Sequence, residues 1–377
     1  MRNLILIISL GLFSGCTTAL LNKPDSGNND WWMFHHGTDH LGATGIKGPV
    51  PPLELVWKLD ASSRPISSIS SPSVAGDYIY VGSRDHNLYA LNKNTGRIIF
   101  KFKTGSWIDS SPSVVKDRVY IGSYDSTVYA LNRFTGKLIW KYKTRGSIGG
   151  FSSPSVWKNV LYIGANDYYF YAIDALSGKL LWEFKTGYEI HTPPLIYNNK
   201  VYFGSGDRYL YALYADTGKL VWKFLTGNNV FSAPAARDDI LYFGSYDNNI
   251  YALNTETGEI VWKYKTDDRV CSSPTIYKDI VFIGGWNKTF YAFDRISGAV
   301  KWRFNTEDHI MSSASVCNDI VYMGSHDSYF HALDANTGKN LWSFKTGGVI
   351  FSCPAVDSTM VFVGSDDGFL YAFGEKK

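Results

Sequence analysis

The chain has 377 residues, of which 16% are aromatic, 19% are charged and 35 are glycine. The many large apolar side chains and a formal charge of only +3 exclude a disordered chain, and without a dense Lys/Arg run we expect no nucleic-acid partner. Abundant aromatic residues and glycine favour an all-β fold of short strands and tight turns.

The N-terminus has the pattern of a lipoprotein signal peptide over residues 1–15. A basic start, Met1-Arg2, precedes an apolar run over 4–13 that is too short to span a bilayer. Ser14-Gly15-Cys16 resembles the bacterial lipobox, in which the cysteine is acylated and the preceding peptide is removed. An ordinary secretory signal with an incidental cysteine is the alternative interpretation.

Acylation of Cys16 predicts a protein that is attached to a membrane through its lipid alone and faces the periplasm. Thr17 follows the cysteine, and the sorting rule for bacterial lipoproteins then implies the outer membrane. We expect residues 16–52 to be a lipid-anchored tether and lead-in. The lead-in contains three histidines without a fixed carboxylate or cysteine partner, so we expect no metal site there; they are His35, His36 and His40.

The other cysteines are Cys271, Cys317 and Cys353. Their number is odd, and no two of them are adjacent or form a CxxC motif. We therefore expect buried thiols and no disulfide framework.

A Ser-Ser-Pro element recurs along the rest of the chain. Its prolines lie at 72, 112, 154, 194, 234, 274 and 354, and Ala314 fills the missing position. The spacings are 40, 42, 40, 40 and 40 residues, then 80 across the Ala314 copy, so one unit of about 40 residues occurs eight times.

Each copy contains a Gly-Ser-x-Asp turn or a variant of it, then Tyr-Ala-Leu or a relative. In all copies but the eighth, Thr/Ser-Gly follows, with an aromatic residue, usually Trp, four residues after the glycine. The aspartates of the first motif can accept turn amides, so we interpret them as structural caps rather than catalytic acids. These predicted caps are Asp85, Asp125, Asp167, Asp207, Asp247, Asp327 and Asp367.

Four strands per copy at this period predict an eight-bladed β-propeller of antiparallel blades. The eighth copy stops before its fourth strand, and the segment 53–59 matches that strand at the other end of the chain. We predict that 53–59 completes the last blade and that 53–373 is a single propeller domain. In the fourth strand at 138–143, alternation predicts that Leu138, Trp140 and Tyr142 share a packed face.

The segment Ala130-x-Asn132-x-x-Thr135-Gly136-Lys137-x-x-Trp140 resembles the tryptophan-docking repeat of the pyrroloquinoline-quinone (PQQ)-like β-propellers. The resemblance covers essentially all of 53–373 and is specific for the fold rather than for function. Lipid-anchored members of the BamB type are non-enzymatic scaffolds of the β-barrel assembly machinery. The resemblance thus implies a protein partner in the cell envelope and a monomeric propeller.

Quinoprotein dehydrogenases of the same family hold PQQ and Ca²⁺ over the propeller axis. They are much longer, and their site residues come from long excursions and, in many, from two adjacent cysteines, whereas the loops of this chain are short and uniform. We therefore expect no enzyme activity and no cofactor, and HExxH, GxSxG, P-loop and GxGxxG motifs are absent. A recognition module for a glycan or a secreted partner is a further alternative.

The connections between copies differ in sequence from one copy to the next, while the Thr-Gly turns hardly change. Such variable positions are where a specific function can be encoded on a repetitive fold. Turn residues such as Tyr246 and Trp286 add aromatic groups to the same side. The hypothesis assigns a partner-binding role to Trp107, Glu189, His191, Asn229, Arg269, Trp286 and His309.

Overall fold

The computed structural model describes residues 33–35, 37, 40–45, 47–60 and 70–376. Cys16 and the predicted signal peptide lie outside these residues, as does His36. The described part of the chain is all β, and it contains no helix that is long and apolar enough to cross a membrane.

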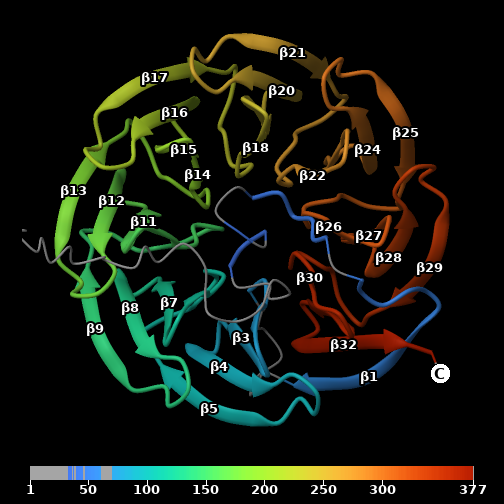
Figure 1. Ribbon diagram of the computed structural model, residues 1–377, viewed down its shortest axis with the longest axis horizontal. Coiled ribbons are helices and arrows are strands. Elements are labelled where there is room, and N and C mark those ends of the chain that lie inside the picture. Colours follow the sequence, from blue (N-terminus) through green and yellow to red (C-terminus); the bar gives the residue numbers. More distant parts are fainter. Residues whose placement is uncertain (1–32, 36, 38–39, 46, 61–69, 377) are drawn as a thin grey trace, which may run out of the picture.

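Thirty-two strands form eight four-stranded antiparallel sheets that stand as blades around a central axis (Figure 1). Blades are numbered in chain order, and their strands are given from the axis outward. Blade 1 contains β2 (Ser73–Ala75), β3 (Tyr78–Gly82), β4 (Asn87–Asn92) and β5 (Ile98–Lys103). Blade 2 contains β6 (Ser113–Val115), β7 (Arg118–Ser123), β8 (Thr127–Asn132) and β9 (Leu138–Lys143). Blade 3 contains β10 (Ser155–Trp157), β11 (Val160–Gly164), β12 (Tyr169–Asp174) and β13 (Leu180–Lys185). Blade 4 contains β14 (Leu195–Tyr197), β15 (Lys200–Gly204), β16 (Tyr209–Tyr214) and β17 (Leu220–Leu225).

The second half of the ring repeats this arrangement. Blade 5 contains β18 (Ala235–Arg237), β19 (Ile240–Ser245), β20 (Asn249–Asn254) and β21 (Ile260–Lys265). Blade 6 contains β22 (Thr275–Tyr277), β23 (Ile280–Gly284), β24 (Thr289–Asp294) and β25 (Val300–Asn305). Blade 7 contains β26 (Ser315–Cys317), β27 (Ile320–Gly324), β28 (Tyr329–Asp334) and β29 (Asn340–Lys345). Blade 8 contains β30 (Ala355–Val356), β31 (Met360–Gly364), β32 (Phe369–Glu375) and, from the other end of the chain, β1 (Leu53–Asp60).

The two ends of the chain close the ring in blade 8. Strand β1 pairs antiparallel with β32, from Leu53 opposite Glu375 to Asp60 opposite Phe369. This confirms the predicted eight-bladed propeller and its closure by the N-terminal strand. The pairing leaves β1, rather than β32, at the outer edge of the blade.

The hydrophobic core is divided into layers between neighbouring blades rather than gathered at one centre. Between blades 2 and 3, for example, Tyr120 packs in one buried cluster with Leu161 and Tyr171. The three cysteines Cys271, Cys317 and Cys353 are buried and free, as predicted. Because each layer joins only adjacent blades, the ring depends on every interface being formed.

Each docking tryptophan joins its blade to the next one along the chain. The indole Nε1 of Trp140 in blade 2 donates a hydrogen bond to the carbonyl of Ala175 in blade 3, at 3.0 Å. The ring covers Gly178, where φ is +73° and a Cβ atom would lie 2.7 Å from Cδ2 of the indole. Only glycine allows both this backbone conformation and this close approach. In blade 8 the contact is made by Trp57 of β1, which donates to the carbonyl of Lys93.

The Ser-Ser-Pro element supplies a second set of contacts close to the axis. In blade 6, Ser272 Oγ accepts the amide of Gly284 within the blade, at 2.8 Å. The amide of Ser273 donates to Ser313 Oγ of blade 7 at 2.8 Å, and Thr275 Oγ1 donates to the carbonyl of Ala314 at 2.7 Å. The element therefore orders each innermost strand and binds it to its neighbour.

The motif aspartates contact two blades at once. Asp125 Oδ2 accepts the hydroxyl of Tyr129 in its own blade and the amide of Gly105, which follows the outer strand of the preceding blade, both at 2.7 Å. The corresponding tyrosine hydroxyl donates to Asp85, Asp167, Asp207, Asp247 and Asp367. Asp327 instead accepts the amides of Tyr329 and Glu307.

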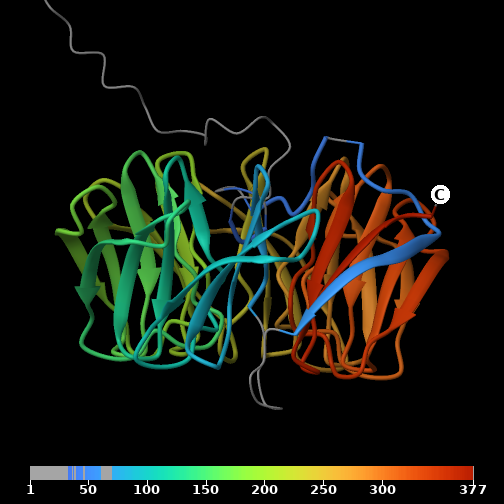
Figure 2. The same ribbon diagram turned by 90° about the horizontal axis from the view of Figure 1, so that it is seen from below.

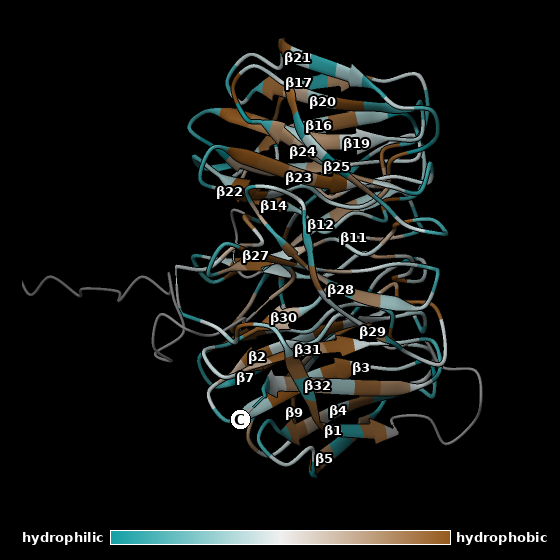
Figure 3. Cartoon of the chain, turned by 90° about the vertical axis from the view of Figure 1, so that its right-hand side faces the viewer, coloured by the Kyte–Doolittle hydropathy of each residue, from teal (hydrophilic) through white to brown (hydrophobic). Residues whose placement is uncertain are grey.

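The prediction for the face of Leu138 was wrong. A register shift in the pairing of β8 with β9 falls between Ala130 and Leu131, so Leu138 precedes the regular part of the ladder and is 46% exposed. Trp140 is buried, as predicted. Colouring by hydropathy shows apolar stretches along the strands and polar residues in many of the connecting loops (Figure 3).

The lead-in lies in the central channel instead of packing outside the ring (Figure 1). The carbonyl of Leu41 accepts the amide of Ile276, and Ala43 pairs in parallel with Val316. Farther along, Asn318 Nδ2 donates to the carbonyl of Gly48, at the boundary between blades 7 and 8. The segment therefore runs beside inner strands of blades 6 and 7 and then crosses the ring to reach β1 at its outer edge (Figure 2).

Two histidines of the lead-in are completely buried. Burial lowers the pKa of His35 to about 3 and that of His40 to about 4. His40 Nδ1 lies 3.0 Å from the carbonyl of Pro234, while neither ring nitrogen of His35 has a hydrogen-bond partner among the described residues. Both rings are therefore neutral inside the folded propeller.

Candidate functional site

Seen from the side, the ring has two faces where the strands end (Figure 2). We call one the loop face: it carries the connections between blades, such as 104–112, and the turns formed by the Gly-Ser-x-Asp motif. We call the other the turn face, which carries the Thr-Gly turns. The variable third residues of the Gly-Ser-x-Asp motif gather on the loop face; they are Arg84, Tyr124, Asn166, Gly206, Tyr246, Trp286, His326 and Asp366.

Trp107 is one of the predicted partner-binding residues and is 46% exposed. Its ring lies edge-on to Tyr124, with centroids 5.8 Å apart, and the guanidinium carbon of Arg84 is 5.4 Å from its centroid. Arg84 also donates from Nε and Nη2 to the two oxygens of Asp109, at 2.9 and 3.0 Å. The tryptophan is thus held by neighbours while much of its surface remains open to a partner.

Glu189 and His191 form a pair of their own, with Oε2 and Nε2 3.1 Å apart. His191 stacks on Phe231, with ring centroids 5.0 Å apart. Burial lowers the pKa of His191, although Glu189 acts in the opposite direction. The backbone carbonyl of Asn229 accepts the amide of Tyr246, at 3.0 Å.

Arg269, Trp286 and His309 lie together. The guanidinium carbon of Arg269 is 5.0 Å from the indole centroid of Trp286, and His309 stacks on the same indole at 4.9 Å. Trp286 Nε1 donates to Cys271 Sγ at 3.0 Å, and His309 Nδ1 donates to the carbonyl of Trp286 at 2.7 Å. The indole is therefore fixed on both sides.

These groups join into one continuous series of rings, which we call the aromatic arc: His191, Phe231, Tyr246, Trp286, His309, His326 and Phe351. Its neighbouring centroids are 4.3–6.1 Å apart. The arc brings together Glu189, His191, Asn229, Arg269, Trp286 and His309 of the predicted set, whereas Trp107 lies apart with Arg84. His326 was not predicted, although it occupies the same motif position as Trp286.

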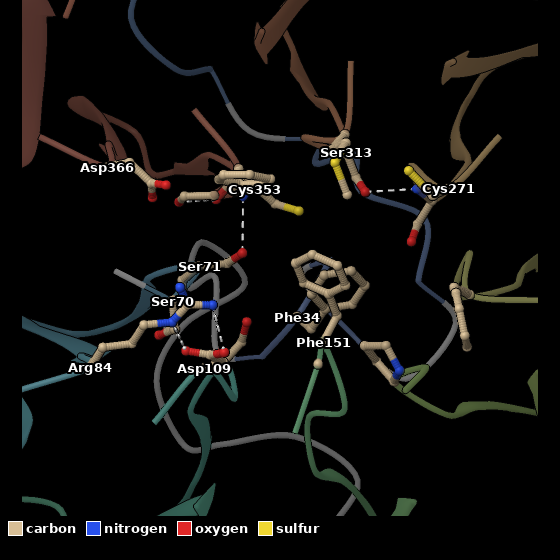
Figure 4. A pocket seen from close by; sticks show the side chains of 18 of the residues that line it. Phe34, Ser70, Ser71, Arg84, Asp109, Phe151, Cys271, Ser313, Cys353 and Asp366 are labelled. Atoms are coloured by element: carbon tan, nitrogen blue, oxygen red, sulfur yellow. Dashed lines mark hydrogen bonds and ion pairs between the residues drawn. The ribbon is translucent and has the colours of Figure 1, made fainter. Parts of the chain in front are cut away.

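A pocket of about 400 Å³ opens on the axis of the loop face, and all eight blades contribute to its wall. Its charged residues, Arg84, Asp109 and Asp366, gather on one side (Figure 4). The remainder of the wall is mainly apolar or weakly polar. It consists of Phe34, Phe151, Phe231, Phe351, Met311, Cys271, Cys353, Tyr124, Gly150, Pro193 and the serines at 70, 71, 111, 273, 313 and 352.

The thiols in this wall are neutral. Burial raises the pKa of Cys271 to about 12 and also raises that of Cys353. Across the described part of the chain no three His, Cys, Asp or Glu residues are placed to hold a metal ion. Arg84 is the one cationic residue among those that line the pocket, and it is already engaged by Asp109.

The fold and this face together define an eight-bladed β-propeller with a uniform turn face and a variable loop face. The sequence model of a family described as outer membrane protein assembly factor BamB matches residues 54–167, 149–233, 209–317 and 297–377. Because these segments cover most of the chain, it belongs to this family. A comparison with curated proteins finds no match.

Solved structures share the fold at low sequence identity. BamB from Moraxella catarrhalis superposes with a TM-score of 0.72 and 20% identity, covering 86% of this chain and 98% of that one. The computationally designed protein Ika8 gives 0.76 and 18%, covering 85% and 99%. A europium-containing methanol dehydrogenase gives 0.78 and 14%, covering 92% and 98%. At these identities the likeness shows the fold alone.

Proposed function

We propose that this chain is a non-enzymatic, lipid-anchored scaffold of the outer membrane that faces the periplasm and binds a protein partner of the β-barrel assembly machinery. The aromatic arc carries this proposal. Exposed or half-buried aromatic rings with a cation above them are the groups that contribute most to protein interfaces. They occur at variable positions of a scaffold whose opposite face is nearly uniform.

A PQQ-dependent dehydrogenase is the competing function, since a methanol dehydrogenase shares the fold. PQQ carries three carboxylates, whereas the lining residues Asp109, Asp366 and Arg84 have a formal charge of −1 (two carboxylates and one guanidinium). With Arg84 already bound to Asp109, the wall has no free cation for a trianionic quinone. The absence of a metal-ligating group among the described residues likewise gives no support for Ca²⁺. The residues present do not fit this cofactor.

Partner capture tests the proposal. The full chain would be cross-linked in intact cells, purified from detergent-solubilised membranes and compared with a variant carrying Trp107→Ala, Glu189→Ala, Arg269→Ala and Trp286→Ala. We expect the parent chain to retain components of the β-barrel insertase and the variant to lose them. Retention of a glycan or of an unrelated secreted enzyme instead would favour a recognition module.

A matched control changes exposed apolar residues on the other face. Phe134 precedes the Thr135-Gly136 turn and Leu176 the equivalent Ser177-Gly178 turn, and they are 44% and 47% exposed, so Phe134→Ala with Leu176→Ala removes apolar surface there. This variant should capture the partner normally. Loss of capture in the control but not in the loop-face variant would show that the turn face binds the partner.

The lipid anchor is tested separately. Replacing Cys16 by Ser removes the thiol that would carry the lipid, so we expect release from the membrane fraction and loss of a metabolic palmitate label. Unchanged fractionation with an unchanged label would contradict the anchor, irrespective of the outcome of partner capture.

A further inference from the structure

Two consecutive apolar residues are exposed near the start of the outer strand in each of blades 1, 2 and 3. The six side chains are 39–51% exposed, and the pairs are Ile98-Ile99, Leu138-Ile139 and Leu180-Leu181. In each blade a register shift leaves the second residue of the pair opposite no residue of the adjacent strand. The exposure of the pairs is therefore built into the backbone of three neighbouring blades.

Cationic residues surround these pairs. The segments 97–103, 137–143 and 179–185, which we call the outer belt, contain seven lysines, one arginine and one acidic residue. Their formal charge is +7, whereas the whole chain carries only +3, so the rest of the molecule is net acidic. The corresponding strands β5, β9 and β13 follow one another along the outer wall of the ring (Figure 1). The positive charge is thus concentrated on one side of the propeller.

Acidic groups within the belt do not neutralise this charge. All eight cationic residues are exposed. The single carboxylate, Glu183, binds Nη2 of Arg145, which lies outside the belt, at 2.7 Å. Lys101 Nζ lies 4.7 Å from the ring centroid of Tyr89, a contact that orients the lysine without a counter-charge. The belt therefore presents positive charge to solvent directly beside exposed apolar side chains.

We propose that the outer belt binds the surface of a bilayer that contains anionic phospholipids. The apolar pairs enter the headgroup region, and the long lysine side chains extend to the lipid phosphates. Lysine is depleted in protein–protein interfaces, whereas lysine beside apolar residues is typical of segments that lie on membranes. The same pattern in three blades also suits a binding partner whose surface has the same chemistry throughout.

This contact is separate from the proposed scaffold function. The sequence predicts attachment through the lipid of Cys16 alone, whereas the belt adds a second contact that needs neither acylation nor a protein partner. Because the belt lies on the outer wall of the ring, a bilayer bound there leaves the loop face open. Failure of partner capture would therefore not affect binding of the belt to lipid, and the reverse also holds.

Flotation with lipid vesicles tests the proposal. Residues 17–377 contain all thirty-two strands but neither the predicted signal peptide nor Cys16, so neither can attach this chain to lipid. We expect binding to vesicles of phosphatidylglycerol and phosphatidylethanolamine to be roughly tenfold or more tighter than binding to phosphatidylcholine vesicles. Raising NaCl from about 0.05 M to about 0.5 M should weaken it. No detectable binding to the anionic vesicles, or equal binding to both kinds, would overturn the proposal. Cross-linking of the belt lysines to a protein in cells, without vesicle binding, would identify a protein-binding surface instead.

Two matched variants locate the binding. Lys137→Gln with Ile139→Ser changes the belt in blade 2, and Lys339→Gln with Leu341→Ser changes the same positions of blade 7, outside the belt. Ile139 and Leu341 are 40% and 42% exposed, so the two variants lose similar apolar surface. The blade 2 variant should bind anionic vesicles roughly tenfold more weakly, and the blade 7 variant should bind normally.

Circular dichroism of each variant checks folding. If the blade 2 variant does not fold, Lys137→Gln alone keeps the belt testable and should weaken binding roughly fivefold. Equal losses in blades 2 and 7 would show that the overall charge of the chain, rather than the belt, attracts the vesicles. Full binding by the folded blade 2 variant would likewise refute the assignment.

Discussion

Replacing one docking tryptophan should show how strongly adjacent blades are coupled. Trp140 is the clearest case because it is 8% exposed, covers Gly178 of the next blade and donates to the carbonyl of Ala175. Trp140→Ala removes both the ring and the hydrogen bond. Trp140→Phe keeps an aromatic ring, and blade 1 already has Phe100 at the corresponding position, packed over Gly136.

The two substitutions should differ in cost for a reason visible in the structure. Truncating a buried tryptophan to alanine costs about 3–5 kcal/mol through lost burial and the cavity left behind. The carbonyl of Ala175 also accepts the hydroxyl of Tyr120 and Arg118 Nη1, both at 3.0 Å, so it keeps partners in either variant. Trp140→Phe should therefore cost only about 1–2 kcal/mol, chiefly the net value of one hydrogen bond and some lost contact area.

Thermal unfolding followed by circular dichroism measures this difference. With an unfolding entropy of roughly 2.1 cal/mol/K per residue over 377 residues, 1 kcal/mol corresponds to about 1.3 °C in Tm. Trp140→Ala should lower Tm by roughly 4–7 °C and Trp140→Phe by roughly 1–3 °C.

Trp107→Ala is the matched control, because that tryptophan is 46% exposed and should cost under about 0.5 kcal/mol. If Trp140→Ala and Trp107→Ala gave the same Tm, the docking tryptophans would not carry the coupling between blades. If Trp140→Phe were as damaging as Trp140→Ala, hydrogen bonding or ring shape would matter more than buried area.

The remaining predictions concern glycine, closure and pH. Gly178→Ala should lower the free energy of unfolding in urea by about 1–3 kcal/mol more than Gly76→Ala does. Both glycines have positive φ, but only at Gly178 would a Cβ atom meet an indole ring. Equal losses in the two variants would contradict that contact. Deleting 53–60 should lower Tm sharply by exposing the edge of β32, whereas deleting 17–30 should not, and equal effects would refute closure by β1. Since the buried lead-in histidines have pKa values of about 3 and about 4 against an ordinary 6.5, the unfolded chain binds protons first as pH falls. The free energy of unfolding should therefore fall by about 2 kcal/mol per histidine between pH 7.5 and 5. His35→Phe should make this dependence on pH weaker. An unchanged dependence in His35→Phe would be inconsistent with a neutral buried ring.

The repeat itself made the fold predictable from the sequence. A docking tryptophan, a Thr-Gly turn and a motif aspartate recur at fixed separations, and each makes its main contacts within its own blade or with an adjacent one. The missing outer strand of the last copy and its match at 53–59 determined the closure. Such contacts follow from the pattern because the same geometry is used again in each blade.

The tertiary structure decided everything that depends on residues from distant parts of the chain meeting at the axis. Phe34 packs against Ala233 and Cys353, which precede equivalent prolines of two repeats, but Phe34 itself lies outside the repeats, so their period does not predict where it packs. The aromatic arc likewise depends on side-chain directions at positions that the repeat leaves free to vary. Even locally, one register shift was enough to expose Leu138, since alternation along a strand predicts the packed face only where the ladder is regular.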